Sequence, residues 1–542
     1  MSQRIEFQNA TVYDGSGAPP ATANVLVEDG RIEQVGAESA DAERVVDLDG
    51  DALAPGFVDM HAHSELRLFD HPEAPEKVTQ GITLEVLGQD GVSVAPIPEG
   101  TQQEWARRVQ TLLGTRETWE WRTVEGYLNA LESADSAVNC AYHAPHGNLR
   151  SLAASFDDRP LDDVELETVT NALESAIESG AFALSTGMIY PPSSYGRDDE
   201  LEALGEVLAA HDGFMVSHVW NESDRVVESI DRFVRLCERA GCHPHVSHLK
   251  VAGEANWGAS TEILDVFEAA EDRGVRVTFD QYPWTAGSTM LTAVLPPWAR
   301  ASETDEMLDC LRDPVARQRI REDIETGGGG DWENLAGAAG TWENILVTNT
   351  GSGQAEGETI AAVAADRGVQ PVEAVCDLLV EEDLDVTMAD FVMDDQDIER
   401  FLADPRGTIC TDGIFGGKPH PRAVGTYPRL LGRYVREHGT LPLELAVYKA
   451  AGHPADVLGL PDRGRVREGY LADLVAFDPD AVRANASYDN PMRHADGVEH
   501  VLVDGEFVVR DGEVTGERPG SVLRSAEEWD GSARPILADR DS

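Results

Sequence analysis

The chain of 542 residues carries a formal net charge of −56, from 99 acidic and 43 basic residues, and only four of the basic residues are lysines. This charge argues against nucleic acid and anionic membranes as partners, because both are themselves negatively charged. No run of about 18 apolar residues is available to span a membrane. Such an acidic, lysine-poor surface is screened only in concentrated salt, which predicts a halophile's cytoplasmic protein. A disordered acidic chain is the alternative, but 42% of the residues are hydrophobic.

The cysteines and the N-terminus also favour the cytoplasm. Six cysteines are scattered along the chain without a C-x-x-C pair, which is typical of reduced, mostly buried thiols. The first residues contain no apolar export segment.

Short strands are expected at both ends of the chain. They cover residues 4–7, 24–28, 31–35 and 44–48 near the N-terminus, and 473–477, 500–503 and 506–509 near the C-terminus. Asp29-Gly30 and Asp504-Gly505 lie between alternating runs and indicate hairpin turns. We therefore predict one small β-sandwich domain built from both termini, residues 1–55 and 456–542.

Residues 56–455 alternate between strands and helices. Helices are expected at 201–211, 225–240 and 261–273, and each is followed by a glycine and an apolar strand. Repeated units of this length favour an α/β fold with a closed parallel (β/α)8 barrel, the TIM barrel. An open doubly wound sheet is the alternative, but no Gly-rich dinucleotide turn supports it.

The rhythm breaks between about residues 290 and 345. This stretch contains Pro296-Pro297-Trp298 and a run of four glycines. We interpret it as an insertion on a β-α loop that forms a lid over the site. An insertion on the surface without a role in the site is the alternative.

Polar side chains stand at the carboxyl ends of the expected strands, where barrel enzymes place their chemistry. His61 and His63 alternate along one strand and therefore face the same side. The complete set is His61, His63, Asp90, His218, His248 and Asp412. Any one of these histidines alone is more often structural, but together they suit two divalent metal ions with a bridging ligand.

Six motifs carry a resemblance to a known family. They are Pro55–His63, Ser185–Pro192, Ser247–Lys250, Asp280–Ser288, Thr411–Gly413 and Pro419–Arg422, and Gly469–Val475 resembles a return into the small domain. The chain resembles the amidohydrolase superfamily and, within it, the N-acyl-D-amino-acid deacylase (D-aminoacylase) family. The resemblance covers nearly the whole chain, and the middle motifs are the more specific ones.

The resemblance implies a metal centre with one or two ions, Zn²⁺ being expected. His61, His63 and Asp412 would hold the more exposed ion, and Asp412 would also be the general base. His218 and His248 would hold the buried ion.

The resemblance also implies a substrate site. Lys250, Tyr282, Ser288 and Arg422 would bind the substrate's carboxylate, and Tyr190 would line the pocket. The guanidinium of Arg422 together with the ammonium of Lys250 is a suitable carboxylate receptor, because a guanidinium can donate two parallel hydrogen bonds to a carboxylate. A surface role is the alternative for Arg422.

Two positions depart from the family pattern. Well-known members carry a cysteine where Asp90 stands, and a carboxylate bridge would shift the metal preference away from the softest ions. Related enzymes use a carboxylated lysine as the bridge, but Lys77 is the one lysine between His63 and His218 and lies in an expected helix. The arginine common in relatives two residues after His218 is replaced by Trp220, which leaves the side-chain preference open.

The resemblance implies hydrolysis of the linear amide of N-acyl-D-amino acids, with this small molecule as the partner. A cyclic amidase of the hydantoinase or dihydroorotase type and a non-catalytic scaffold are the alternatives. Assembly into a homo-oligomer stays open.

Overall fold

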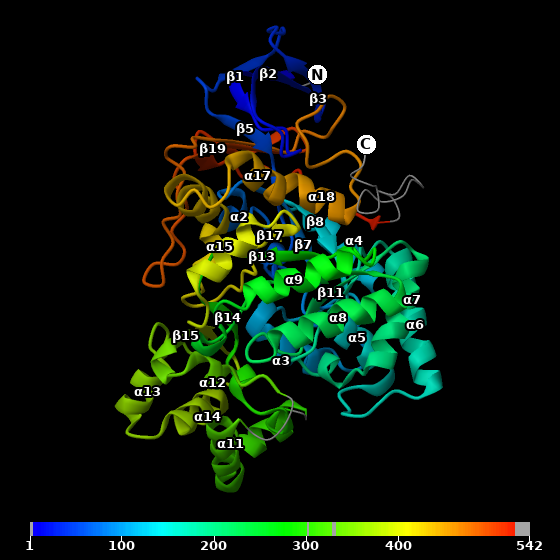
Figure 1. Ribbon diagram of the computed structural model, residues 1–542, viewed down its shortest axis with the longest axis vertical. Helices are drawn as coiled ribbons and strands as arrows, with labels where there is room; N and C mark the ends of the chain where they lie inside the picture. The colour runs from blue at the N-terminus through cyan, green and yellow to red at the C-terminus, as the bar shows by residue number, and fades with distance from the viewer. Residues whose placement is uncertain (1–3, 301–302, 328–331, 526–542) are drawn as a thin grey trace.

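A closed barrel of parallel strands forms the centre of the molecule (Figure 1). The computed structural model describes residues 4–300, 303–327 and 332–525. The eight barrel strands are β6 (Phe57–Asp59), β7 (Ile82–Leu87), β8 (Asn139–Tyr142), β10 (Leu184–Gly187), β11 (Phe214–His218), β12 (His243–Val246), β13 (Thr278–Gln281) and β17 (Gly407–Ile409). The short strand β9 (Ala144–Pro145) continues β8 and pairs with β10.

Backbone hydrogen bonds close the barrel between its last and first strands. The amide of Met60 donates to the carbonyl of Ile409 (3.3 Å), and the amide of Asp412 donates to the carbonyl of His61 (2.8 Å). The hydroxyl of Tyr427 reinforces this junction by donating to the carbonyls of Val58 and Ile409. The predicted (β/α)8 fold is therefore confirmed, and the open sheet is excluded.

Helices surround the strands, and their apolar faces pack onto them. Between barrel strands lie α1 (Arg67–Asp70), α2 (Pro75–Val78), α3 (Gln102–Leu113), α4 (Val124–Glu132), α5 (His146–Ala154), α6 (Asp163–Glu178), α7 (Asp198–Ala210), α8 (Val226–Ala240), α9 (Ser260–Glu271) and α15 (Asp395–Ala403). After β17 come α16 (Arg422–Arg429), the π-helical turns η6 (Leu430–Glu437) and η7 (Tyr448–Gly452), α17 (Leu443–Val447) and α18 (His453–Leu458).

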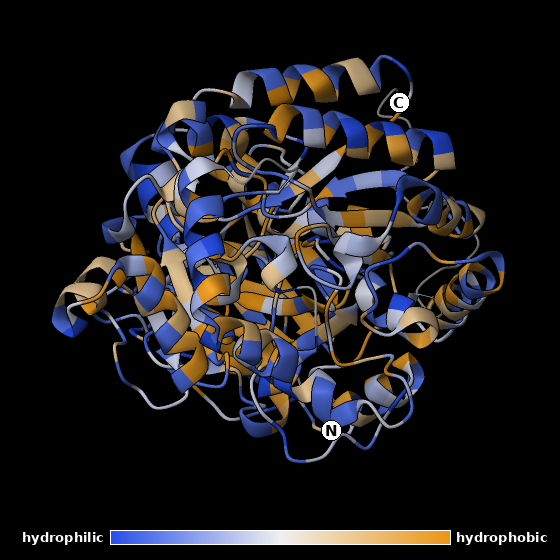
Figure 2. Cartoon of the chain, turned by 90° about the horizontal axis from the view of Figure 1, so that it is seen from below, coloured by the Kyte–Doolittle hydropathy of each residue, from blue (hydrophilic) through white to orange (hydrophobic). Residues whose placement is uncertain are grey.

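Sequence signals explain where these helices begin and end. Asp162 caps α6 in a capping box with Glu165, and Gly241 ends α8 in the left-handed conformation. Apolar residues gather toward the interior and polar ones on the outer helix faces (Figure 2). Among the described residues, no helix combines the length and the apolar character needed to cross a bilayer.

The two ends of the chain share one sheet of nine strands. The N-terminal strands are β1 (Arg4–Val12), β2 (Ala21–Glu28), β3 (Arg31–Gly36), β4 (Arg44–Asp47) and β5 (Ala52–Pro55), and the C-terminal ones are β18 (Leu474–Phe477), β19 (Val498–Val503), β20 (Glu506–Arg510) and β21 (Glu513–Val514). Strand β5 pairs antiparallel with β18 and so joins the two halves. Phe7, Leu474 and Phe507 belong to the small core of this sheet.

A long excursion separates β13 from α15. It contains a three-stranded antiparallel sheet of β14 (Gly287–Met290), β16 (Val386–Asp390) and β15 (Ile345–Thr350). It also contains α10 (Thr304–Arg312), α11 (Pro314–Thr326), α12 (Leu335–Ala339), α13 (Ile360–Arg367) and α14 (Pro371–Glu381). The excursion is thus longer than 290–345, because β15 and β16 belong to this separate sheet and not to the barrel.

The expected domain limits, 1–55, 56–455 and 456–542, stay predictions, as does a lid at 290–345. Part of the last range, residues 526–542, lies outside the described residues.

Candidate metal centre and substrate pocket

The six expected metal ligands converge at one mouth of the barrel. His61 and His63 follow β6, Asp90 follows β7, His218 ends β11, His248 follows β12 and Asp412 follows β17. All six side chains are buried. The carboxyl ends of parallel barrel strands meet at one face, so strand order alone brings together residues far apart in sequence.

Four of these residues form the first group of donor atoms. The Nε2 atom of His61 lies 3.4 Å from Oδ2 of Asp90, and Nε2 of His63 lies 3.3 Å from Oδ1 of Asp412. The donor atoms of all four lie within 4.8 Å of one another. This is a compact set of two imidazoles and two carboxylates, which suits a divalent ion such as zinc.

Asp90 also belongs to a second group with His218 and His248. Its Oδ1 lies 3.3 Å from Nε2 of His248, whereas its Oδ2 faces His61 and His63. Each carboxylate oxygen of Asp90 therefore faces a different group, which is the arrangement that a ligand shared by two metal ions requires.

Several of these buried atoms have no hydrogen-bond partner among the described residues. They include Nδ1 and Nε2 of His61, Oδ1 of Asp90 and Nε2 of His218. Buried polar atoms are normally satisfied, so such a cluster indicates an absent ligand. The donor set fits divalent metal ions, which would coordinate these nitrogen and oxygen atoms.

Three of the donors have left-handed backbones, with φ of 54° at Asp90, 34° at His248 and 47° at Asp412. Non-glycine residues rarely adopt this conformation, and it concentrates at functional sites, where the surrounding structure maintains the strain.

Asp280, at the end of β13, positions the histidines from behind. Its Oδ1 accepts a hydrogen bond from the backbone amide of His248 (2.7 Å) and lies 3.8 Å from Nδ1 of His61, while its Oδ2 lies 2.9 Å from Nε2 of His245. Carboxylates behind metal-binding imidazoles commonly fix ring orientation. Sequence reasoning quoted Asp280 in a motif but gave it no role, although its place at a strand end was a signal.

Glu222 is a second residue that sequence reasoning missed. Its carboxylate accepts from Nζ of Lys250 at 2.7 and 2.9 Å and lies 3.2 Å from Nδ1 of His248. It also lies close to His218, with 3.6 Å between Oε2 and Nε2. The i, i+4 spacing of His218 and Glu222 was the available signal. The charge of Lys250 is thus partly offset by Glu222.

Arg422 links the expected base to the substrate pocket. Its Nη2 lies 2.9 Å from Oδ2 of Asp412 and donates to the carbonyl of Ser288 at 2.9 Å, and the guanidinium stands over the Tyr282 ring at 4.4 Å. Burial raises the pKa of Asp412, but Arg422 and the nearby histidines outweigh this effect, and the net pKa lies below its ordinary value. Asp412 is therefore a carboxylate at neutral pH.

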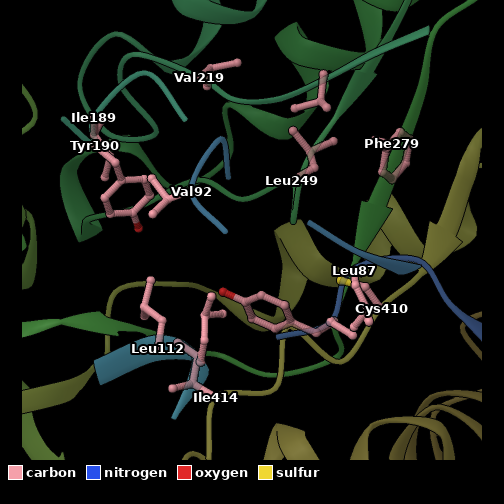
Figure 3. Close-up of a cluster of buried hydrophobic side chains, with 14 of the residues drawn as sticks. Leu87, Val92, Leu112, Ile189, Tyr190, Val219, Leu249, Phe279, Cys410 and Ile414 are labelled. Atoms are coloured by element: carbon pink, nitrogen blue, oxygen red, sulfur yellow. The ribbon is translucent and has the colours of Figure 1, made fainter. Parts of the chain in front are cut away.

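A pocket opens beside these residues. Its wall contains Tyr190, Lys250, Tyr282, Ser288 and Arg422, the five residues expected to contact substrate. The Tyr190 hydroxyl lies 2.8 Å from the Thr289 hydroxyl, and its ring packs edge-on against that of His218. Figure 3 shows Tyr190 among apolar side chains such as Val92, Leu112 and Ile414.

Lys77 lies in α2 and is held away from a metal-bridging role. Its Nζ lies 2.7 Å from Oδ2 of Asp59 and 3.1 Å from Oε2 of Glu85. Burial lowers the pKa of Lys77, but the two carboxylates outweigh it and raise the pKa above the ordinary value. A protonated ammonium cannot carry a carbamate, so Asp90 stays the candidate for the bridging group.

Comparisons with known proteins agree with this geometry. The model of the amidohydrolase family matches residues 44–509. The D-aminoacylase of Alcaligenes xylosoxydans xylosoxydans is 32% identical over 515 residues, covering 95% of this chain and 96% of the relative. The crystal structure of the N-acyl-D-glutamate deacylase of Bordetella bronchiseptica, with zinc and a phosphonate that mimics the tetrahedral intermediate, superposes with a TM-score of 0.82 at 32% identity, covering 96% of this chain and 99% of that one. A D-aminoacylase structure described as having a binuclear metal centre gives 0.79 at 31% identity, with coverage of 96% and 99%.

Proposed function

Because this chain belongs to the amidohydrolase family, we propose that it hydrolyses the linear amide of N-acyl-D-amino acids to a carboxylate and a free D-amino acid. The observation that carries the proposal is Asp90, whose two oxygens face two groups of imidazoles, next to an expected base, Asp412, that an arginine holds. The relatives named above act on N-acyl-D-amino acids according to their descriptions.

We assign the metal ligands as expected from the sequence. His61, His63 and Asp412 would hold one zinc ion and His218 and His248 the other, with Asp90 between them. Bound zinc supplies Lewis acidity, which lowers the pKa of a water molecule and polarises the amide carbonyl.

The chain's own residues then move the proton. Asp412 accepts a proton from the attacking water and later delivers it to the nitrogen of the leaving amine, as the C–O bond forms and the C–N bond breaks. Arg422 holds Oδ2 of Asp412 at 2.9 Å and so leaves Oδ1 directed toward the reacting centre.

The substrate's carboxylate is expected to bind between Arg422 and Lys250. In the structure both cations contact protein carboxylates, Asp412 and Glu222, but two Arg422 nitrogens, Nε and Nη1, have no partner among the described residues. A buried guanidinium with free donors can form charge-assisted hydrogen bonds with a carboxylate. Tyr190, Tyr282 and Ser288 would complete the wall around it.

A substrate assay in molar salt tests this function. N-acetyl-D-amino acids, their L-enantiomers, hydantoin and dihydroorotate are compared before and after treatment with a chelator. We expect turnover of the D-enantiomers alone, loss with the chelator and recovery with Zn²⁺. Turnover of the cyclic amides instead would favour a cyclic amidase. A purified protein that contains no divalent metal and turns over none of these compounds would favour a non-catalytic scaffold.

A further inference from the structure

A second cavity lies beside the substrate pocket. We call it the side cavity. Its lining includes Val92, Trp105, Arg108, Met290, Arg300 and Met307. None of these six residues has a part in the metal centre or in the proposed carboxylate site, so the role of the cavity is not explained by the proposed function.

The side cavity and the substrate pocket share one wall. Tyr190 lines both of them. On α3, Thr111 faces the side cavity and Leu112 the substrate pocket, and Figure 3 shows Tyr190 beside Val92, which lies two residues after Asp90. A molecule bound at the metal centre therefore has the side cavity as its neighbour.

Strand β14 gives the direction from one site to the other. The carbonyl of Ser288 accepts from Arg422, the Thr289 hydroxyl contacts Tyr190, and Met290 lines the side cavity. Two residues of extended chain span roughly 7 Å. A substrate with its carboxylate at Arg422 thus has the side cavity farther along the same strand, as a place for its opposite end, the acyl group.

Arg300 makes the chemistry of this cavity specific. Its side chain is buried at 6% exposure, its Nε has no hydrogen-bond partner, and no described carboxylate lies within ion-pair distance of it. The other arginines of the lining are paired, Arg107 with two aspartates and Arg108 with Glu104. An arginine keeps its charge in proteins, and a buried charge without a partner is costly. Arg300 is therefore suited to an anionic ligand.

Resting on the proposed function, we propose that the side cavity binds the acyl group of the substrate, and that this group is a short dicarboxylic acyl such as glutaryl, whose free carboxylate pairs with Arg300. The apolar side chains Trp105, Met290 and Met307 would contact its methylene groups. Hydrolysis adds one water and yields the dicarboxylic acid and the D-amino acid.

Matched substrates test the proposal. N-glutaryl and N-pentanoyl derivatives of one D-amino acid have acyl chains of equal length and differ in the terminal charge. We expect kcat/KM to be about tenfold or more higher for the glutaryl compound, since a charge-assisted contact supplies that difference. Arg300→Gln should remove this advantage through KM and leave the pentanoyl compound within about twofold, and Arg300→Lys should restore part of it.

Arg107→Gln is the matched control, because Arg107 lines the same cavity but is paired with Asp305 and Asp383. This variant should leave kcat/KM unchanged for both the glutaryl and the pentanoyl compound. Equal kcat/KM for the two wild-type reactions, or a parallel loss in Arg300→Gln, would overturn the proposal.

A binding measurement separates this proposal from the proposed function. Glutarate, compared with pentanoate, should raise the Tm of the metal-loaded wild type and should not raise that of Arg300→Gln. If N-acetyl-D-amino acids are turned over but glutarate gives no greater shift than pentanoate, the inference fails and the proposed function stands. If no N-acyl-D-amino acid is turned over, the acyl assignment fails with the function, whatever glutarate does.

Discussion

Asp90, His248 and Asp412 combine left-handed backbones with donor atoms aimed at a shared space. Gly91, the residue after Asp90, packs tightly against its surroundings. A Cβ on Gly91 would lie 2.5 Å from Oγ of Ser193 and 2.9 Å from the amide nitrogen of Gly187. The loop after β7 can therefore approach β10 only with glycine there. The position of the Asp90 carboxylate thus depends on a neighbour that has no side chain.

The general base can be tested by Asp412→Asn. The amide keeps an oxygen toward the metal group but cannot accept a proton, so kcat for an N-acetyl-D-amino acid should fall by about 10²–10⁴-fold. Metal content, measured by mass spectrometry, should stay near that of the wild type, because His61, His63 and Asp90 remain. Asp489→Asn, at an exposed position, is the control. Full activity of Asp412→Asn would remove this residue from the mechanism.

The sequence indicated the donors themselves but not their supports. His61 and His218 could be placed because they end apolar strands, and strand ends meet at one barrel mouth. Strand position and the i, i+4 spacing from His218 could have marked Asp280 and Glu222 as candidates, but their roles depend on contacts between distant segments, such as that of Glu222 with Lys250. The assignment of the ligands and substrate contacts itself stays a prediction.

At the scale of elements, periodicity predicted the barrel helices closely: α8 ends just before Gly241, and α9 ends at Glu271, three residues before Gly274. It failed for the excursion after β13. Strands β15 and β16 are separated by helices α13 and α14, as neighbouring barrel strands are separated by helices, but β16 pairs antiparallel with both β15 and β14. Pairing direction is decided by tertiary contacts, which a local pattern does not contain.

Lys449, in the π-helical turn η7, predicts a pH dependence of the free energy of unfolding. Burial lowers the pKa of its Nζ to about 7, with Asp404 opposing and Arg406 adding to the shift, whereas an unfolded lysine titrates near 10.4. Between these values the unfolded chain binds more protons. The free energy of unfolding should therefore rise as the pH increases from about 7 toward 10.

Lys449→Met should flatten this rise. The measurement is urea unfolding of both proteins at pH 6.5, 8 and 9.5, with the difference between them as the readout. Parallel pH dependences would contradict the depressed pKa, because the other titrating groups are common to both proteins.

At the scale of the whole molecule, the net charge of −56 is the dominant feature. Like charges on a folded surface repel one another, and the screening length falls from about 10 Å at 0.1 M salt to about 3 Å at 1 M. Surface ion pairs such as that of Arg232 with Asp198 offset little of this repulsion, since exposed pairs contribute about 0–1 kcal/mol.

Stability should therefore rise with salt. We expect the Tm to increase steadily from 0.1 to 2 M KCl, measured by circular dichroism. A relative without a large charge excess, studied in the same buffers, is the control and should change much less. A Tm that is constant or falls with KCl would contradict the halophilic interpretation.

The pairing of β5 with β18 has a consequence for synthesis on the ribosome. Residues 52–55 find their antiparallel neighbour only when residues 474–477 have emerged. At about 5–20 residues per second, that wait lasts roughly 20–80 s. Throughout it the nascent chain carries a half-finished sheet with an open edge, which is a surface that chaperones recognise and that other nascent chains can join. Strand β18, which is translated after the whole barrel, thus covers the open edge of β5.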